Sequence, residues 1–484
     1  MGAYQRFINS QFIQLALNSL YYGIGDLLQK FISVLLLPIY TRYLLPEDYG
    51  VIALLMLMTL VVSATTMFGL TNGIARYIFY VDKEQVTRDE VVWSPLLFVI
   101  TLTCIVTAIL IANADIISSF LFDNANHQYV VVLTLINVLI SNVTGIGRSV
   151  LIFEERVKAV NIINISGAVV GVVTGIYLVA FLGRGVDGAI EAGLVSSAFM
   201  FIHTYFLSIR RYKLKFNQKI LAKQLRFSFP LVATVFAFLL IDTSDRYLLK
   251  LYLPLSEVGL YNVGYQVGML MMLLVGGFTS AWPPFYFKNN QNGEGQVICN
   301  NVLKMYVLVA APFAVLIALF SPIAIKLLTT QAYDDAYTVV PWVALAYLLK
   351  GPYLIFVMGL QAKNKTIWMV YLEISAAIIN IVLNLLLIPE IGREAAAITT
   401  LLSYTFMSVG AFWLVNRVNP IPNISLGKPV LTILMATVGS SVIFLPVFAS
   451  FPVLISIGSF GVLVSLIALL FREDFKRYAS IVTK

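Results

Sequence analysis

The sequence predicts an all-α integral membrane protein with fourteen transmembrane helices. Of its 484 residues, 60% are hydrophobic and only 12% are charged. Soluble globular domains carry about 25% charged residues. Apolar stretches of about 20 residues, the length that crosses a bilayer as a helix, recur from one end of the chain to the other. Composition and hydropathy together therefore exclude an ordinary soluble domain.

Hydropathy over a window of about 20 residues places the spans in order along the chain. The predicted spans are 19–41, 50–73, 93–113, 128–150, 159–182, 186–208, 228–252, 258–282, 302–321, 338–360, 366–388, 394–415, 429–449 and 452–471. Residues 1–18 mix polar and apolar side chains, which predicts a short amphipathic helix on the membrane surface. Gly183 and Gly185 predict a tight turn between the fifth and sixth spans.

The basic residues orient these spans. With the N-terminus inside, 24 of the 32 Lys and Arg residues lie in cytoplasmic segments, five lie on the opposite side and three lie within spans. The five outer residues are Arg42, Arg184, Lys250, Lys326 and Arg393. Cytoplasmic loops carry this excess of positive charge, so both termini are predicted to be cytoplasmic. The densest basic run, Arg210 to Arg226, then faces anionic lipid headgroups, which favours membrane topology over nucleic-acid binding as its explanation.

Two motifs repeat at nearly the same offset. LLPEDYGVIALLM (44–56) parallels LPLSEVGLYNVGY (253–265) and aligns Gly50 with Gly259, while LGRGVDGAIEAGLVSS (182–197) parallels EIGREAAAITTLLSY (390–404) and aligns Gly185 with Gly392. Halves with six spans each share one orientation, which predicts a pseudo-twofold axis along the membrane normal and a substrate site between the halves. The predicted parts are an N-terminal six-helix bundle with its amphipathic segment at 1–209, a basic cytoplasmic linker at 210–226, a C-terminal six-helix bundle at 227–420, and helices 13 and 14 with a cytoplasmic tail at 421–484.

Ionisable side chains inside or at the ends of spans point to transport. An ionised group at bilayer depth costs at least about 2.5–3.5 kcal/mol, so such residues usually face a wet cavity or a partner. The candidates for binding an anionic substrate are Lys350, Arg246, Lys30, Arg76 and Arg148. The candidates for ion coupling or charge pairing are Asp26, Asp242, Asp245, Glu191 and Glu373.

Helical spacing separates some of these candidates from the others. Asp26 and Lys30 are four residues apart, as are Asp242 and Arg246, so each pair can neutralise itself on one helix face and Asp245 is left to pair elsewhere. Arg76 and Arg148 lie near cytoplasmic helix ends, where long side chains reach the interface. Glu191 and Glu373 lie inside their spans without a partner at helical spacing, which leaves an ion relay and a structural role both open.

Lys350 is the leading candidate for contact with an anion. It lies near the middle of its predicted span, has no acidic residue three or four positions away, and is followed by Gly351 and Pro352. Amides and tyrosines within spans are candidates for sugar contacts, with helix–helix packing as the alternative. These residues are Asn137, Asn142, Asn161, Asn164, Asn262, Gln266, Asn380, Asn384, Tyr22, Tyr261, Tyr265 and Tyr347.

Several stretches resemble one family of membrane transporters. GIGDLLQKFISVLLLPIYTRYLLPEDYGVIAL (23–54) is similar to the first-helix signature of the polysaccharide transporter family, the Wzx-type oligosaccharide flippases of the MOP superfamily. FGLTNGIARY (68–77) and IDTSDRYLLKLYLPLSEVGLYNV (241–263) resemble that family's second-helix end and seventh helix. The resemblance covers the whole chain and agrees with the fourteen-helix count. It implies the MOP flippase fold.

The resemblance also implies a function. The family moves oligosaccharide repeat units linked to undecaprenyl pyrophosphate across the bacterial inner membrane, for O-antigen (lipopolysaccharide), capsule or exopolysaccharide biosynthesis, by alternating access through a cationic central cavity. Expected partners are this lipid-linked substrate, membrane lipids, and the polysaccharide polymerase and chain-length regulator. A lipid II-type flippase or a multidrug/cation antiporter of the same superfamily is the alternative, and coupling to H⁺ or Na⁺ is left open.

An enzyme is not expected. The chain has two cysteines, two separated histidines, short loops, and no phosphate-binding loop or nucleophile motif, which predicts no metal site, no cofactor and no direct use of ATP.

Overall fold

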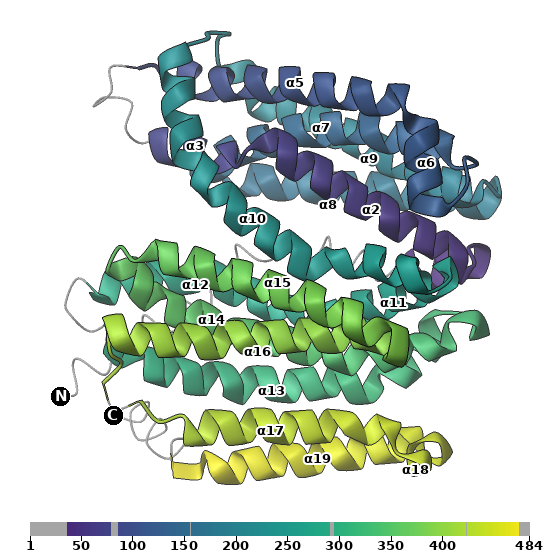
Figure 1. Cartoon of the computed structure of the whole chain (residues 1–484), viewed down its shortest axis with the longest axis vertical. Helices are drawn as coiled ribbons and strands as arrows, with labels where there is room; N and C mark the ends of the chain where they lie inside the picture. The colour runs from purple at the N-terminus through teal and green to yellow at the C-terminus, as the bar shows by residue number, and fades with distance from the viewer. Residues whose placement is uncertain (1–35, 79–85, 155, 291–294, 423, 474–484) are drawn as a thin grey trace. The chain divides into compact units, whose positions relative to one another are not determined.

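The computed structural model is all-helical over the residues it describes, which are 36–78, 86–154, 156–290, 295–422 and 424–473 (Figure 1). Packing divides these residues into an N-terminal unit that ends at Asn262 and a C-terminal unit that begins at Val263. The boundary falls inside one helix, α11 (Leu255–Gly268). The sequence repeat placed the boundary at 210–226 instead. Compact packing and sequence repetition are different properties, so the repeat boundary stays a prediction.

The described residues contain twelve helical segments that are long and apolar enough to cross a bilayer. A thirteenth is α10 (Gln218–Tyr252), which bends by 46° between Phe229 and Val232, where the sequence has a proline at 230. A proline inside a helix removes one backbone hydrogen bond and clashes with the preceding turn, which bends the helix. These thirteen segments match the second to fourteenth predicted spans. Since 19–41 lies mostly outside the described residues, the total of fourteen stays a prediction.

The N-terminal unit is built around α7, which packs against α5 and α9. Its elements are α2 (Pro46–Met67), α3 (Leu70–Tyr77), α5 (Arg88–Ala112), α6 (Ala114–Phe122), α7 (Gln128–Phe153), α8 (Val157–Gly175), η1 (Ile176–Phe181), α9 (Gly185–Leu207) and η2 (Ile209–Arg211), followed by α10. Close approach depends on small residues. A Cβ on Gly147 of α7 would lie 2.3 Å from Thr204 of α9, and one on Gly167 of α8 would lie 2.2 Å from Met200.

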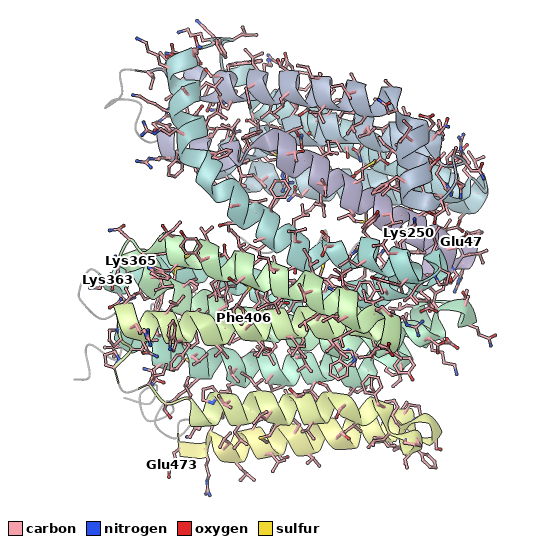
Figure 2. All side chains as sticks on the ribbon, in the orientation of Figure 1. Glu47, Lys250, Lys363, Lys365, Phe406 and Glu473 are labelled. Carbon is pink, nitrogen blue, oxygen red and sulfur yellow. The ribbon has the colours of Figure 1, made fainter. Side chains whose placement is uncertain are left out.

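The C-terminal unit surrounds α14, which packs against α13 and α16. Its elements are η3 (Met269–Met271), α12 (Met272–Asn290), α13 (Gly295–Leu328), η4 (Gln331–Val339), α14 (Val340–Ala362), α15 (Thr366–Ile391), α16 (Arg393–Val418), α17 (Gly427–Ser441), η5 (Val442–Phe444), α18 (Pro446–Ser450) and α19 (Pro452–Leu470). The span containing α14 is largely buried, whereas α19 exposes most of its apolar surface, as a lipid-facing helix does. Lys363, Lys365 and Glu473 lie at the same end of this unit (Figure 2), as predicted for residues on one side of a membrane.

The glycines of the repeat occupy equivalent positions. A Cβ on Gly50 would lie 2.2 Å from the carbonyl oxygen of Leu255, and a Cβ on Gly259 would lie 1.7 Å from that of Pro46. Pro46 and Leu255 are themselves repeat-related at the Gly50–Gly259 offset, so the contact is reciprocal, as a twofold relation requires. The second pair of repeat glycines also agrees, because Gly185 and Gly392 both have positive φ, of 57° and 85°. These two pairs support the parallel repeat.

Gly259→Ala is expected to destabilise the protein because the added methyl group meets a backbone oxygen that cannot move without its helix. Overpacking of this kind typically costs about 1–3 kcal/mol. Gly193→Ala is the matched control, since a Cβ there meets nothing within 4 Å and alanine favours the helix. Thermal unfolding in detergent should show a lower midpoint for Gly259→Ala alone, and equal midpoints for the two variants would contradict the reciprocal contact.

Candidate functional site

Lys350 lies on a part of α14 that neighbouring helices hold in place. Pro352 has no backbone N–H, so the carbonyl of Leu348 loses its usual helical partner. The hydroxyl of Tyr306 on α13 donates to this carbonyl at 3.1 Å, and the hydroxyl of Ser408 on α16 donates to the next carbonyl, that of Leu349, at 2.5 Å. The helix continues through the proline as a result. This stretch of α14 is therefore tied to α13 and α16 by hydrogen bonds beside Lys350.

Tyrosines surround the Lys350 ammonium group. Its Nζ donates to the hydroxyl of Tyr404 at 2.8 Å and lies 4.9 Å from the ring centroid of Tyr404 and 5.4 Å from that of Tyr347. Tyr347 also shares a hydrogen bond of 2.7 Å with Tyr265. An ammonium group over an aromatic ring gains about 0.5–2 kcal/mol, depending on how far it is desolvated. These contacts orient a half-buried cation, as preorganised anion binding requires.

Glu373 of α15 is buried in the same unit and accepts a hydrogen bond from the hydroxyl of Tyr353 on α14. Sequence spacing offered no partner for this carboxyl group. This hydrogen bond comes from another helix, and its donor is a hydroxyl group. Glu373 is thus a desolvated acid held by a tyrosine, an environment that suits either structural hydrogen bonding or binding of a proton or cation.

Most of the amides and tyrosines proposed for sugar contacts belong to the packing. Asn142 donates to Thr66 at 2.8 Å and to Thr103 at 3.2 Å, which links α7 to α2 and α5. Asn384 donates to Asn380 at 3.1 Å and accepts from Thr399 of α16 at 2.9 Å. Among the tyrosines, Tyr261, Tyr265 and Tyr347 are buried, and Tyr22 lies outside the described residues. The hydrogen bonds favour the helix-packing alternative for Asn142 and Asn384, and sugar contacts by the other residues stay a prediction.

In the N-terminal unit, Arg246 pairs with its neighbour Asp245. The Arg246 guanidinium donates to Asp245 Oδ1 at 2.8 Å and to the backbone carbonyl of Asp242 at 2.7 Å. The hydroxyl of Tyr261 on α11 donates to the other oxygen of Asp245, and the guanidinium lies 5.7 Å from the Tyr261 ring centroid. The expectation that Asp245 pairs elsewhere is wrong. Spacing along α10 could not predict the contact with Tyr261, because that residue lies on α11. Tyr261 contacts both Asp245 and Arg246, so the three residues form one buried cluster.

Asp242 lines a groove of about 410 Å³ within the N-terminal unit. The groove lies between α10 and the region where α2 ends and α3 begins. Its walls are mainly apolar, with hydroxyl and amide groups from residues that include Ser63, Thr71, Asn72 and Thr243. An acid at the wall of an apolar groove suits a polar or cationic ligand group.

Glu191 is held by two partners near the start of α9. It accepts hydrogen bonds of 2.6 Å from Arg184, which immediately precedes the helix, and of 2.6 Å from Tyr129 of α7. The pair is partly exposed, with relative exposures of 44% for the Arg184 side chain and 16% for that of Glu191. Charge pairing thus accounts for Glu191 without an ion relay.

Glu191→Gln is therefore expected to leave transport intact and to lower stability by less than about 1 kcal/mol, the range of exposed ion pairs. Polymer display by a strain that carries this variant measures the transport effect directly. Loss of display at a normal protein level would contradict the structural assignment and restore Glu191 as an ion relay.

The remaining candidates lie apart from these clusters or outside the described residues. Arg76 is exposed in the last turn of α3, with its guanidinium 4.4 Å from the Phe227 ring centroid, as expected for a side chain that reaches the interface. Arg148 is half-buried on α7, five residues before that helix ends. Asp26 and Lys30 lie outside the described residues, so their pairing stays a prediction.

The basic segment 210–226 contacts acidic residues of other helices, which the count of Lys and Arg residues did not consider. Arg211 pairs with Glu154 at 2.8 Å, and the backbone N–H of Lys213 donates to Asp89 at 3.1 Å. Tyr212 also donates its hydroxyl to Glu154, and burial together with this acid raises the pKa of Tyr212. Residues 210–217 are thus a docked connection between α9 and α10, and residues 218–226 form the first turns of α10.

Comparison with solved structures identifies the fold of this molecule. The structure of the lipid II flippase MurJ in an inward closed conformation superposes with a TM-score of 0.72 at 15% identity, covering 96% of this chain and all of that one. An inward-facing multidrug resistance MATE transporter of the MOP superfamily superposes with a TM-score of 0.68 at 16% identity, covering 82% and 96%. The chain therefore has the fold of MOP-superfamily transporters. At these identities the likeness establishes the fold alone.

The family follows from sequence. A model of the family described as "Polysaccharide biosynthesis protein" matches residues 39–338, which is more than half of the chain, so the chain belongs to that family. Protein 1 of the Lsg locus of Haemophilus influenzae is 23% identical over 364 residues, covering 72% of this chain and 86% of that protein. The prediction of a multi-pass, all-helical membrane protein is confirmed by the spans and by the fold, and the family description places the chain in polysaccharide biosynthesis.

Proposed function

We propose that this protein translocates oligosaccharide repeat units linked to undecaprenyl pyrophosphate from the inner to the outer leaflet of the bacterial inner membrane. The observation that carries the proposal is Lys350. It is a half-buried cation, oriented by Tyr404 and Tyr347, in a largely buried span of a transporter of the polysaccharide biosynthesis family. The product feeds O-antigen, capsule or exopolysaccharide assembly, with the polymerase and chain-length regulator as partners.

The chemistry of the proposed substrate requires a carrier with buried cations and polar groups. A pyrophosphate and a glycan cannot cross hydrocarbon unaided, whereas a polyprenyl tail can remain in lipid throughout. The carrier therefore needs buried cations for the phosphates and polar groups for the sugars, exposed to each side of the membrane in turn. Lys350 supplies one such cation in the C-terminal unit, and the groove at Asp242 supplies polar groups in the N-terminal unit.

Coupling to a proton or sodium ion is part of the proposal. Glu373 is the strongest candidate to bind the ion, since it is a carboxyl group buried inside a span and held by the hydroxyl of Tyr353. Asp242, which lines the groove, is the second. Asp245 is a weaker candidate because it already holds Arg246 and Tyr261.

A deletion strain tests the function. It should lose its surface polysaccharide, accumulate lipid-linked repeat units that remain accessible only from the cytoplasm, and stay viable. Normal surface polysaccharide would overturn the proposal. A lethal deletion accompanied by arrested cell-wall synthesis would instead identify a lipid II-type carrier, and increased sensitivity to cationic drugs with normal polysaccharide would identify a multidrug antiporter.

Topology is a separate prediction. Reporter fusions at residues 85, 215, 290 and 422 are expected to report the cytoplasm, and those at 122 and 332 the periplasm, because the excess of basic residues faces inward. A periplasmic signal at 215 would contradict the proposed orientation and also the repeat, since both place the connection between α9 and α10 inside.

A further inference from the structure

Three spans of the C-terminal unit meet at a hollow of about 660 Å³. The hollow lies where α13 ends, where α17 passes into η5 and α18, and where α19 begins. Its walls are mainly apolar and include Lys326, Leu327, Phe444, Pro446 and Pro452. Pro446 and Pro452 begin the short helix α18 and the helix α19 beside it. The size of the hollow falls within the range of about 300–1,000 Å³ that is usual for small-molecule sites.

The depth of the hollow follows from the elements around it. The candidate spans Gly295–Leu328 and Gly427–Phe444 end here, and Pro452–Leu470 begins here. Ends of spans lie at the boundary between hydrocarbon and headgroups. In Figure 1, α18 is at the end of the unit opposite to the one at which Figure 2 shows Lys363 and Lys365. The hollow is therefore at the membrane–water interface, and its apolar walls lie beside the phosphate groups of the lipids.

Lys326 is the only cation in the wall of the hollow, and the described protein does not neutralise it. Of the four other basic residues predicted on the outer side, three have acidic partners: Arg184 pairs with Glu191 at 2.6 Å, Lys250 with Asp123 at 2.7 Å and Arg393 with Glu394 at 3.3 Å. Lys326 is exposed and has no hydrogen bond or ion pair with any described residue. A lysine in the last turn of a helix gains some energy from the helix dipole. The helix dipole thus accounts for a lysine at this position, but it does not account for the hollow that Lys326 lines.

From this geometry we propose that the hollow binds an anionic phospholipid, with the lipid phosphate on Lys326 and one acyl chain against the apolar walls. The positive charge of Lys326 favours an anionic lipid, because a zwitterionic lipid has the same acyl chains but no net negative charge. Phe444, which stacks on Trp342 with ring centroids 5.7 Å apart, is fixed in place and can serve as a rigid wall for the chain. This site is separate from the transport path proposed above and does not depend on its substrate.

The test uses the purified full-length protein and native mass spectrometry, with phosphatidylglycerol and phosphatidylethanolamine of identical acyl chains. Wild type should retain phosphatidylglycerol about fivefold better, equivalent to about 1 kcal/mol per basic residue near an anionic surface. Lys326→Gln should lose this preference and Lys326→Arg should keep it. Lys363→Gln, which removes an equally exposed lysine at the other end of the unit, should also keep it. Leu327→Glu, at a residue 78% exposed, should weaken retention by repelling the phosphate.

Three results would overturn the proposal. One is equal retention of the two lipids by wild type, and another is an unchanged preference in Lys326→Gln. The third is a wild-type dimer without bound lipid that Leu327→Glu converts to a monomer, which would identify a second copy of this chain as the occupant.

Discussion

Replacing Lys350 with alanine or glutamine is expected to abolish surface polysaccharide while lipid-linked repeat units accumulate on the cytoplasmic side. The reason is the proposed contact between the ammonium group and the substrate's pyrophosphate, which no neutral side chain can replace. The protein itself should remain folded. The side chain is only half-buried, and the hydroxyl of Tyr404 that accepts its hydrogen bond can bind water instead.

Two controls separate charge from structure. Lys350→Arg should retain much of the flux, because a phosphate accepts either cation even though the geometry changes. Lys363→Ala removes a lysine from the same unit at an exposed position outside the cluster and should have wild-type flux. Wild-type flux in well-expressed Lys350→Ala would shift the phosphate contact to Arg246, Lys30 or the arginines Arg76 and Arg148.

Asp245→Asn should destabilise the protein strongly. Arg246 would lose the Asp245 carboxylate while its side chain stays about 9% exposed, and removing one member of a buried ion pair typically costs about 3–5 kcal/mol. The loss should appear as low expression and a lower unfolding midpoint in detergent.

The double variant Asp245→Asn with Arg246→Gln should recover much of that stability, since the uncompensated charge is gone. If the double variant is stable but inactive, Arg246 has a substrate role in addition to its structural one. A stable Asp245→Asn single variant would contradict the buried pair.

The spans were predictable because the bilayer imposes a fixed length and an apolar composition on each one. The turn at Gly183 and Gly185 was equally visible, and both glycines have positive φ, of 62° and 57°. The repeat was readable from Gly50 and Gly259, since close contacts to Leu255 and Pro46 leave no room for a side chain at either position.

The sequence predicted only part of the side-chain clusters around Lys350, Asp245 and Glu373. Sequence identified Lys350, Asp245 and Glu373 as unusual, because charge is rare inside spans. It could not identify their partners. Tyr404 lies 54 positions from Lys350, and spacing along one helix carries no information about such neighbours. Pro352 offered the one local signal, since a proline predicts a freed carbonyl four residues earlier, at the position where Tyr306 donates.

Transbilayer movement in a defined system tests the central claim most directly. Full-length protein reconstituted into vesicles should move a lipid-linked oligosaccharide pyrophosphate added to one leaflet to the other, measured as the fraction that becomes accessible to an enzyme acting only on the far side. The account predicts movement with wild type, substantial movement with Lys350→Arg and none above protein-free vesicles with Lys350→Ala. Equal movement by wild type and Lys350→Ala, or no movement by wild type under an imposed proton or sodium gradient, would contradict it.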